Sequence, residues 1–308
     1  MIIKFDKEIT RQEIYANGAE LAQIMGIDKD KHGKRVHTWP KRKKLHVVTF
    51  DNPVLVTDNY KIGQLEPALR DTVFALYASP IKTTDYDKTI LDFEQKKYPG
   101  VWGPSVDTVL FCRALEGVNL EDVKTAVEVG SGSGFISKRV LEKAPNLEEM
   151  TLIDLNKYAL KCAKDNIKDE RTELVTGNAI AHMEGKKYDL IICNPPYIPR
   201  PKSIDDNPYE GISLLLYLIS QAKEHLTEQG SLITNISSLC QDIAGEVIAG
   251  ADVEFKGLDA MDVPLKVYNV LNNKEWMDFL LKEKGLVKDR HDGYDYWQTI
   301  SIIEIRPK

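Results

Sequence analysis

Short apolar runs alternate with amphipathic stretches from about residue 123 onward, and this alternation constrains the fold more than any other feature. Five runs rich in β-branched residues are strand candidates: 125–130, 149–155, 172–177, 188–194 and 230–237. Stretches with apolar residues at helical spacing lie between them, at 134–144, 157–167 and 213–226. Strands that alternate with helices form βαβ units, so this region is predicted to be an α/β fold with a mainly parallel sheet.

The two ends of the chain differ from this central pattern. Residues 296–307 predict one more strand, which we expect to be antiparallel and near the sheet edge. The first hundred residues contain two helix candidates, 7–26 and 64–78, without the alternation. We therefore expect a smaller α or α+β domain for substrate recognition over residues 1–97 and the main domain over 98–308.

Composition limits the class of protein. With 308 residues, 43% apolar and 29% charged, the chain is typical of a globular protein. No apolar run approaches the ~20 residues of a membrane helix, and the start shows no signal peptide. The four cysteines are scattered and stand near no histidine cluster, which favours reduced, packed thiols and predicts no metal site. These features predict a cytoplasmic protein without a membrane partner.

A glycine loop follows the first strand of the α/β region. The sequence VEVGSGSGF (127–135) places Gly130, Gly132 and Gly134 between a strand and a helix, where glycine allows close approach to a ligand. Phe135 stands where the dinucleotide fingerprint has Gly or Ala, so the loop fits a pyrophosphate poorly. A close turn without a ligand remains the alternative.

Three polar residues near strand ends are further binding candidates. Asp154 ends the second strand and could accept hydrogen bonds from ribose hydroxyls, or it could cap the next helix. Glu128 is a charge within an apolar strand and needs a partner, which could be a cationic amino group, backbone N–H groups or a structural ion pair. Asn178 could accept from an adenine amine or form a turn.

The sequence NPPY (194–197) ends the fourth strand. The prolines forbid further ladder pairing and hold a backbone carbonyl in a fixed direction. That carbonyl and the side-chain carbonyl of Asn194 can together accept both hydrogens of a planar NH2 group, on which Tyr197 can stack. This geometry suits alkylation of a nitrogen whose lone pair is delocalised, with in-line alignment to a methyl donor.

The glycine loop and Asp154 resemble the S-adenosylmethionine site of Rossmann-like methyltransferases. With NPPY, the chain looks most like the HemK/PrmC-type protein-(glutamine-N5) methyltransferases, which modify release factors. The resemblance implies a seven-stranded sheet, mostly parallel with one antiparallel strand, and S-adenosylmethionine as cofactor. The catalytic residues it implies are Asn194, Pro195, Pro196 and Tyr197. The cofactor-binding residues it implies are Glu128, Gly130, Ser131, Gly132, Gly134, Phe135, Asp154, Leu155, Asn178, Ala179 and Asn194, with Asp107 and Thr108 from the family-like segment 98–115.

The chain departs from that family in three stretches. The family's acidic-Pro-Arg and Gly-Gly stretch after NPPY is replaced by RPKSIDDNPYEG (200–211). Residues 1–97 do not read as the family's helical bundle, and residues 259–285 look like an insertion after the sixth strand. We expect this insertion to border the substrate cleft, because elements that leave the carboxyl end of that strand emerge on the ligand side.

The acceptor stays open at this point. NPPY serves a glutamine amide in a protein, such as a release factor, and equally an exocyclic amine of adenine or guanine in RNA or DNA. The basic stretch 32–44, with Trp39 among its cations, could contact phosphates or could be a solvated loop. A nucleotide-binding module without transferase activity is the third hypothesis. The sequence does not indicate an oligomeric state, and we expect the histidines to be structural or exposed.

Overall fold

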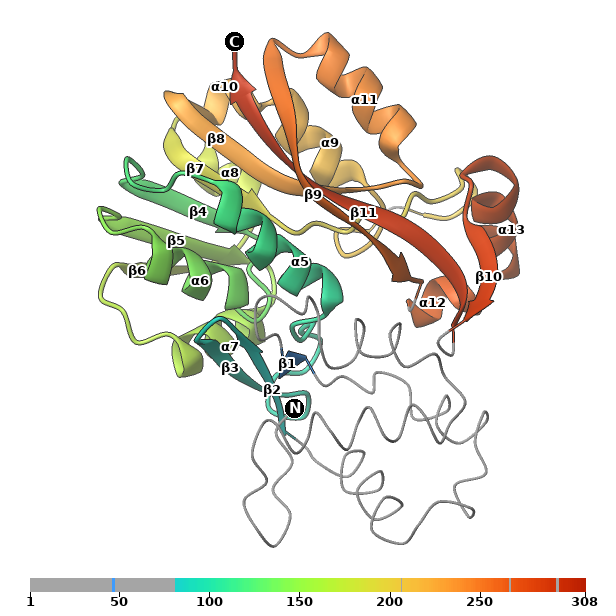
Figure 1. The fold of residues 1–308 in the computed structure, drawn as a ribbon, viewed down its shortest axis with the longest axis horizontal. Coiled ribbons are helices and arrows are strands. Elements are labelled where there is room, and N and C mark those ends of the chain that lie inside the picture. The colour runs from blue at the N-terminus through green and yellow to red at the C-terminus, as the bar shows by residue number, and fades with distance from the viewer. Residues whose placement is uncertain (1–45, 48–80, 206, 266, 292–293) are drawn as a thin grey trace, which may run out of the picture. The chain divides into compact units, whose positions relative to one another are not determined.

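The computed structural model describes residues 46–47 and 81–308, except 206, 266, 292 and 293 (Figure 1). The expected helices at 7–26 and 64–78 and the basic stretch 32–44 lie outside these residues. The chain divides into two compact units: one comprises residues 1–106 and 290–294, and the other comprises 107–289 and 295–308. The predicted domain boundary at 97/98 stays a prediction.

The first unit contains a small antiparallel sheet of β1 (His46–Val47), β2 (Ile81–Tyr86) and β3 (Thr89–Glu94). Asp87 and Lys88 join β2 to β3, and both have positive φ angles, 43° and 81°. This combination belongs to a type I′ hairpin turn, which matches the twist of the strands it connects. The sequence analysis missed the hairpin because neither turn residue is glycine or asparagine.

The second unit is built on one large twisted sheet. Its strands run in the order β6 (Thr172–Thr176), β5 (Glu149–Asp154), β4 (Thr125–Val129), β7 (Tyr188–Cys193), β8 (Leu226–Ser237), β11 (Tyr294–Pro307) and β9 (Val253–Pro264). The five strands β6, β5, β4, β7 and β8 pair in parallel with their neighbours. In contrast, β11 is antiparallel to both β8 and β9. This arrangement confirms the predicted Rossmann-like seven-stranded sheet; a short further strand, β10 (Val287–His291), adjoins β11.

Helices cover both faces of this sheet (Figure 1). One face carries α5 (Val106–Ala114), α6 (Phe135–Lys143) and α7 (Lys157–Asn166). On the other face α8 (Ala179–Met183), α9 (Ser213–Ser220), α10 (Ala222–His225) and α11 (Gln241–Gly250) bury apolar residues against the strands. The predicted helix 213–226 is divided at Gln221, whose φ and ψ of −104° and 8° lie outside the helical region. The alternating apolar pattern thus places a layer of helices on each side.

The stretch 259–285 contains strand and helix. Its first six residues complete β9, and the rest forms α12 (Tyr268–Leu271) and α13 (Lys274–Glu283). A second apolar cluster joins Trp276 and Leu280 of this region to Ile198 and Leu239. The Trp276 indole also donates a hydrogen bond of 2.8 Å to the carbonyl of Pro199. The α12–α13 region therefore packs on the chain that directly follows NPPY.

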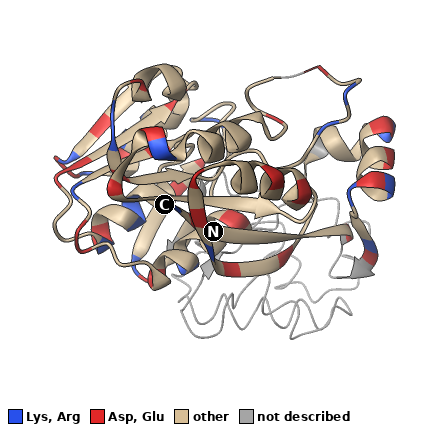
Figure 2. Cartoon of the chain, turned by 90° about the horizontal axis from the view of Figure 1, so that it is seen from above, with Lys and Arg blue, Asp and Glu red and all other residues tan. Residues whose placement is uncertain are grey.

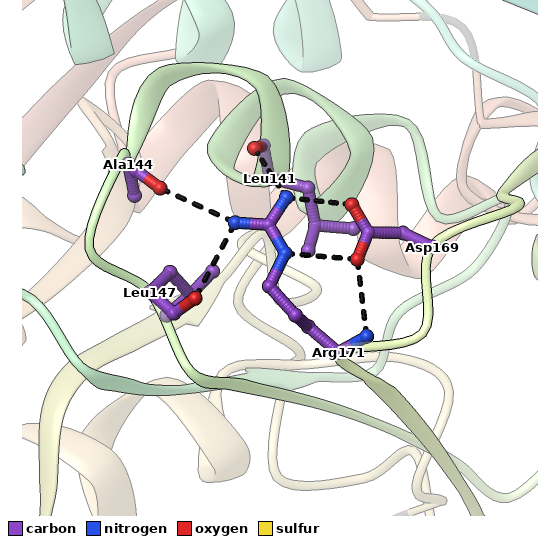
Figure 3. A network of polar contacts seen from close by, with 5 residues as sticks. All are labelled: Leu141, Ala144, Leu147, Asp169 and Arg171. Atoms are coloured by element: carbon purple, nitrogen blue, oxygen red, sulfur yellow. Dashed lines mark hydrogen bonds and ion pairs between the residues drawn. The ribbon is translucent and has the colours of Figure 1, made fainter.

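A polar network fixes the opposite edge of the sheet, where the parallel strands begin (Figure 3). The Arg171 guanidinium pairs with Asp169 and donates to the carbonyls of Leu141, Ala144 and Leu147. These bonds tie the end of α6 and the loop before β5 to the start of β6. The sequence-predicted site residues lie at the other edge, where Asp154 ends β5 and Asn194 follows β7.

Candidate active site

The glycine loop lies at the carboxyl end of β4, beside the point where the strand order reverses. The N–H groups of Gly130 and Ser131 donate to the carbonyl of Ile153 at 2.9 and 3.1 Å, which fixes the loop against β5. Gly134 has a φ of 78°, and a Cβ there would lie 2.9 Å from the Ala163 Cβ on α7. Only glycine satisfies both the conformation and the close packing at this position.

Asp154 joins the end of β5 to the glycine loop. Its two carboxylate oxygens accept hydrogen bonds from the N–H groups of Gly132 at 2.9 Å and Asn156 at 2.8 Å. Burial raises the pKa of Asp154 above its ordinary value, and these two N–H groups oppose that rise. The structure thus brings Asp154 and the loop together, as expected, and each carboxylate oxygen keeps a lone pair for a ligand.

Glu128 is buried beneath the loop and is only 2% exposed. Its carboxylate accepts hydrogen bonds from the Ser137 hydroxyl and, at 3.1 Å, from the Ser137 N–H in the first turn of α6. Burial raises the pKa of Glu128 to about 8, against the opposing effect of these bonds. Among the alternatives for its partner, the structure supports backbone and hydroxyl donors, and the sequence analysis did not single out Ser137.

The other predicted cofactor residues lie around the same edge. Asn178 caps α8, because its side-chain oxygen accepts from the N–H of Ile180 at 2.9 Å, and Ala179 follows it. Leu155 is exposed after β5, whereas the Phe135 side chain is fully buried in the core. The Ser131 hydroxyl is buried and has no hydrogen-bond partner among the described residues. Their roles in cofactor binding stay predictions.

Asn194 follows β7 and faces α5. Alternation along the strand puts Ile191 and Cys193 in the core on the α8–α11 side, so Asn194 points to the other face. There its Nδ2 donates to the Asp107 carboxylate at 3.0 Å, and its Oδ1 accepts from the Nδ2 of Asn235 at 2.6 Å. Asp107, predicted to bind the cofactor, thus contacts the NPPY sequence, and Thr108 follows it in the first turn of α5.

Tyr197 completes this cluster. Pro195 is buried and Pro196 is half-buried, so the turn after Asn194 is held within the protein. Burial raises the pKa of the Tyr197 hydroxyl well above its ordinary value, and the negative charge of Asp107 and a hydrogen bond to that carboxylate raise it further. The Tyr197 ring also packs against the apolar cluster of Trp276. The structure therefore brings Asn194 and Tyr197 together through one carboxylate.

Asn235 is the residue that the sequence analysis missed. In the register of β7 and β8, Cys193 lies opposite Thr234, so Asn194 and Asn235 are neighbours across the sheet. Asn235 is fully buried, and no donor among the described residues reaches its Oδ1. An asparagine within the apolar strand SLITNIS was the available signal, since a buried amide needs a partner.

Comparison with known proteins decides the class of this domain. Residues 106–241, which contain the glycine loop, Asp154 and NPPY, match the family model "Methyltransferase small domain". Residues 106–241 form a methyltransferase small domain. The match confirms S-adenosylmethionine as the cofactor that the sequence predicts for this domain.

Three proteins that are similar to this chain have names that state an activity. The release factor glutamine methyltransferase of Aquifex aeolicus is 32% identical over 47% of this chain and 57% of its own length. The ribosomal protein uL3 glutamine methyltransferase of Francisella tularensis is 28% identical over 44% and 50%. The ribosomal RNA small subunit methyltransferase C of Buchnera aphidicola is 32% identical over 44% and 38%. The chain spans about half the length of the curated relatives it matches.

The described residues contain neither a metal-binding cluster nor a membrane-spanning helix. In the described part of the chain, no group of three or more His, Cys, Asp or Glu side chains could hold a metal ion. Within the same residues, no helix has both the length and the apolar character needed to cross a bilayer. The predicted cytoplasmic location stays a prediction.

Proposed function

We propose that this protein transfers a methyl group from S-adenosylmethionine to the side-chain amide nitrogen of a glutamine in a protein. The observation that carries the proposal is the position of Asn194, whose amide is held at both ends by hydrogen bonds at the carboxyl edge of β7. The names of the relatives from Aquifex aeolicus and Francisella tularensis support a glutamine acceptor.

The glycine-loop region fits S-adenosylmethionine. A Cβ at Gly130 would meet no atom within 4 Å, so the loop leaves open space there, and the Ser131 hydroxyl needs a partner. Asp154 would hold the ribose hydroxyls, while the exposed apolar side chains of Leu155 and Ile180 would pack on the adenine. S-adenosylmethionine, when bound, supplies an electrophilic methyl group.

The residues around Asn194 would orient the acceptor. One lone pair of the Asn194 carbonyl is used by Asn235, and the other can accept an N–H of a planar amide. The carbonyl between the two prolines would accept the second N–H, and the Tyr197 ring would stack on the amide plane. Withdrawing both hydrogens towards fixed acceptors lets the nitrogen lone pair localise and point to the methyl group, which lowers the barrier by alignment and electrostatics.

The second candidate function is methylation of an exocyclic amine of adenine or guanine in RNA. It is favoured by the relative named as a ribosomal RNA methyltransferase, and the acceptors proposed for NPPY would also suit the planar NH2 group of a base. In the view of Figure 2, basic and acidic residues are interspersed along the described elements.

One labelling experiment separates the two candidates. The protein is incubated with methyl-labelled S-adenosylmethionine and either a bacterial lysate, purified release factor or purified uL3, followed by protease or RNase. The proposal predicts label that protease removes and RNase leaves. Label that RNase removes would replace the proposal by the RNA candidate, and neutralising Lys41, Arg42, Lys43 and Lys44 would then be expected to weaken transfer.

A further inference from the structure

Three side chains form a polar row: Asp107 on α5, Asn194 directly after β7, and Asn235 on β8. Asn194 Nδ2 donates to Asp107 at 3.0 Å, and Asn235 Nδ2 donates to Asn194 Oδ1 at 2.6 Å. All donors in the row therefore point the same way, from Asn235 towards Asp107. The row ends in an Asn235 oxygen that is buried and has no donor among the described residues.

The chemistry of Asp107 explains this common direction. A carboxylate only accepts hydrogen bonds, whereas a carboxamide can turn over and present either its oxygen or its nitrogen. Asn194 must present its NH2 to the carboxylate, so its carbonyl faces away, and Asn235 must then present its own NH2 to that carbonyl. Turned over, Asn194 would bring its oxygen against the Asp107 carboxylate. The Asn235 oxygen therefore has no donor because the direction of the hydrogen bonds is set by Asp107 at the other end of the row.

We propose that Asp107 is a positioning residue that fixes the orientation of the Asn194 amide. Asn235, on β8, stabilises that orientation by donating to the Asn194 carbonyl. The inference rests on the proposed function, because the orientation matters only if the Asn194 carbonyl accepts an N–H of the methyl acceptor. It gives Asp107 a different role from the family resemblance, which implies a cofactor contact. The Tyr197 hydroxyl, which also bonds to Asp107, is held by the same carboxylate.

Exchanging the ends of the row tests the orientation directly. In the double variant Asp107→Asn with Asn235→Asp, measured at a pH at which the carboxyl at position 235 is ionised, the acceptor-only group stands at position 235. The Asn194 amide is then held turned over, with its NH2 towards the methyl acceptor. Composition, net charge and the number of hydrogen bonds in the row stay the same. We expect the maximal transfer rate to fall about 10²-fold, the effect of losing one fixed group that stabilises the transition state, with calorimetric affinity for S-adenosylmethionine unchanged. Asp107→Asn alone can keep the natural direction and is expected to lose less than about 10-fold.

The matched control exchanges the same residue types away from the site. Asp252→Asn with Asn146→Asp changes an ion pair with Lys223 and a bond to the Glu121 carbonyl, and transfer should stay at the level of the natural protein. A natural protein that methylates no NH2 group would reject the proposed function itself. If it is active and the double variant of the row equals Asp107→Asn alone, the orientation role is wrong. A tenfold weaker affinity for S-adenosylmethionine in Asp107→Asn, with the maximal rate kept, would make Asp107 a cofactor ligand and overturn the inference.

If the exchanged variant does not fold, the orientation of the Asn194 amide can be measured in the natural protein. Nuclear Overhauser contacts of the Asn194 Nδ2 protons report which way the amide points. The inference predicts contacts to the Asp107 β-protons. Contacts to the Asn235 β-protons in their place would show the opposite orientation and overturn it.

Discussion

The two halves of the candidate site are built in different ways. In the glycine-loop half, backbone groups dominate: Asp154 holds the N–H groups of Gly132 and Asn156, and Ile153 holds the loop by its carbonyl. In the Asn194 half, side chains from α5, β7 and β8 bond to one another. The first half is therefore set by local sequence, whereas the second depends on the complete fold, and changes in the two should affect different steps.

The largest expected effect is in the Asn194 half. Asn194→Ala removes the side-chain acceptor and should lower the maximal transfer rate about 10²- to 10³-fold, while the affinity for S-adenosylmethionine stays nearly unchanged. Transfer of labelled methyl and calorimetry measure the two quantities. Asn146→Ala, which loses only a bond to the Glu121 carbonyl at the opposite edge, is the control. Equal loss of binding and transfer would mean that the halves are not separate.

The second effect concerns the stability of the glycine-loop half. Gly134→Ala combines a positive φ with a contact of 2.9 Å to Ala163, so we expect the free energy of unfolding to fall by about 2–4 kcal/mol. Gly185→Ala has a similar φ of 70° but meets nothing within 4 Å, and should cost only about 1–2 kcal/mol. Urea unfolding measures both. Equal losses would show that the packing of α7 on the loop does not constrain position 134.

A smaller effect should separate cofactor binding from transfer. Asp154→Asn replaces one of two acceptors by a donor, so either the Gly132 or the Asn156 N–H loses its partner. We expect about 10- to 100-fold weaker binding of S-adenosylmethionine by calorimetry, the value of a hydrogen bond to a charged group, with little change in the maximal rate. Asp252→Asn at the opposite edge is the control. Tight binding of NAD by the natural protein, without binding of S-adenosylmethionine, would reject the assignment of this half.

A separate prediction concerns the pH dependence of stability, which is small at any one pH and accumulates over the whole window. Burial raises the pKa of Glu128 from 4.5 to about 8, so the folded protein binds more protons than the unfolded chain between these values. Stability should therefore fall as pH rises through this window, by at most about 1.4 kcal/mol per pH unit. Near pH 4.5 the free energy of unfolding of Glu128→Gln should match that of the natural protein. Near pH 8 the variant should be more stable, so its stability should change less with pH in urea unfolding. If both proteins lost stability equally as the pH rises, the Glu128 charge would not be the cause of the pH dependence.

The difference between the halves also decides what the sequence could predict. The alternation of strands and helices predicted the five parallel strands and the antiparallel last strand, since each βαβ unit leaves a local pattern. Gly130, Gly132 and Asp154 could be placed together because they follow neighbouring strands. The break at Gln221 and the hairpin at Asp87 and Lys88 depend on backbone angles without a local glycine signal.

The contacts around Asn194 could be identified only from the three-dimensional fold. Asn235 is some forty residues from Asn194, and only the parallel register of β7 and β8 makes them neighbours. Asp107 could be related to the site through family resemblance, but its bond to Asn194 required the position of α5 on that face of the sheet. Contacts between side chains of distant segments leave no pattern in a single sequence.

The position of the transferred methyl group tests the central claim most directly. Fragmentation mass spectrometry of the labelled acceptor, after incubation with S-adenosylmethionine and either the natural protein or Asn194→Ala, locates that group. We predict a methyl group on the side-chain nitrogen of a glutamine with the natural protein and none with the variant. A methyl group on a nucleic-acid base, on a carboxylate or on a lysine would contradict the claim, as would equal transfer by Asn194→Ala.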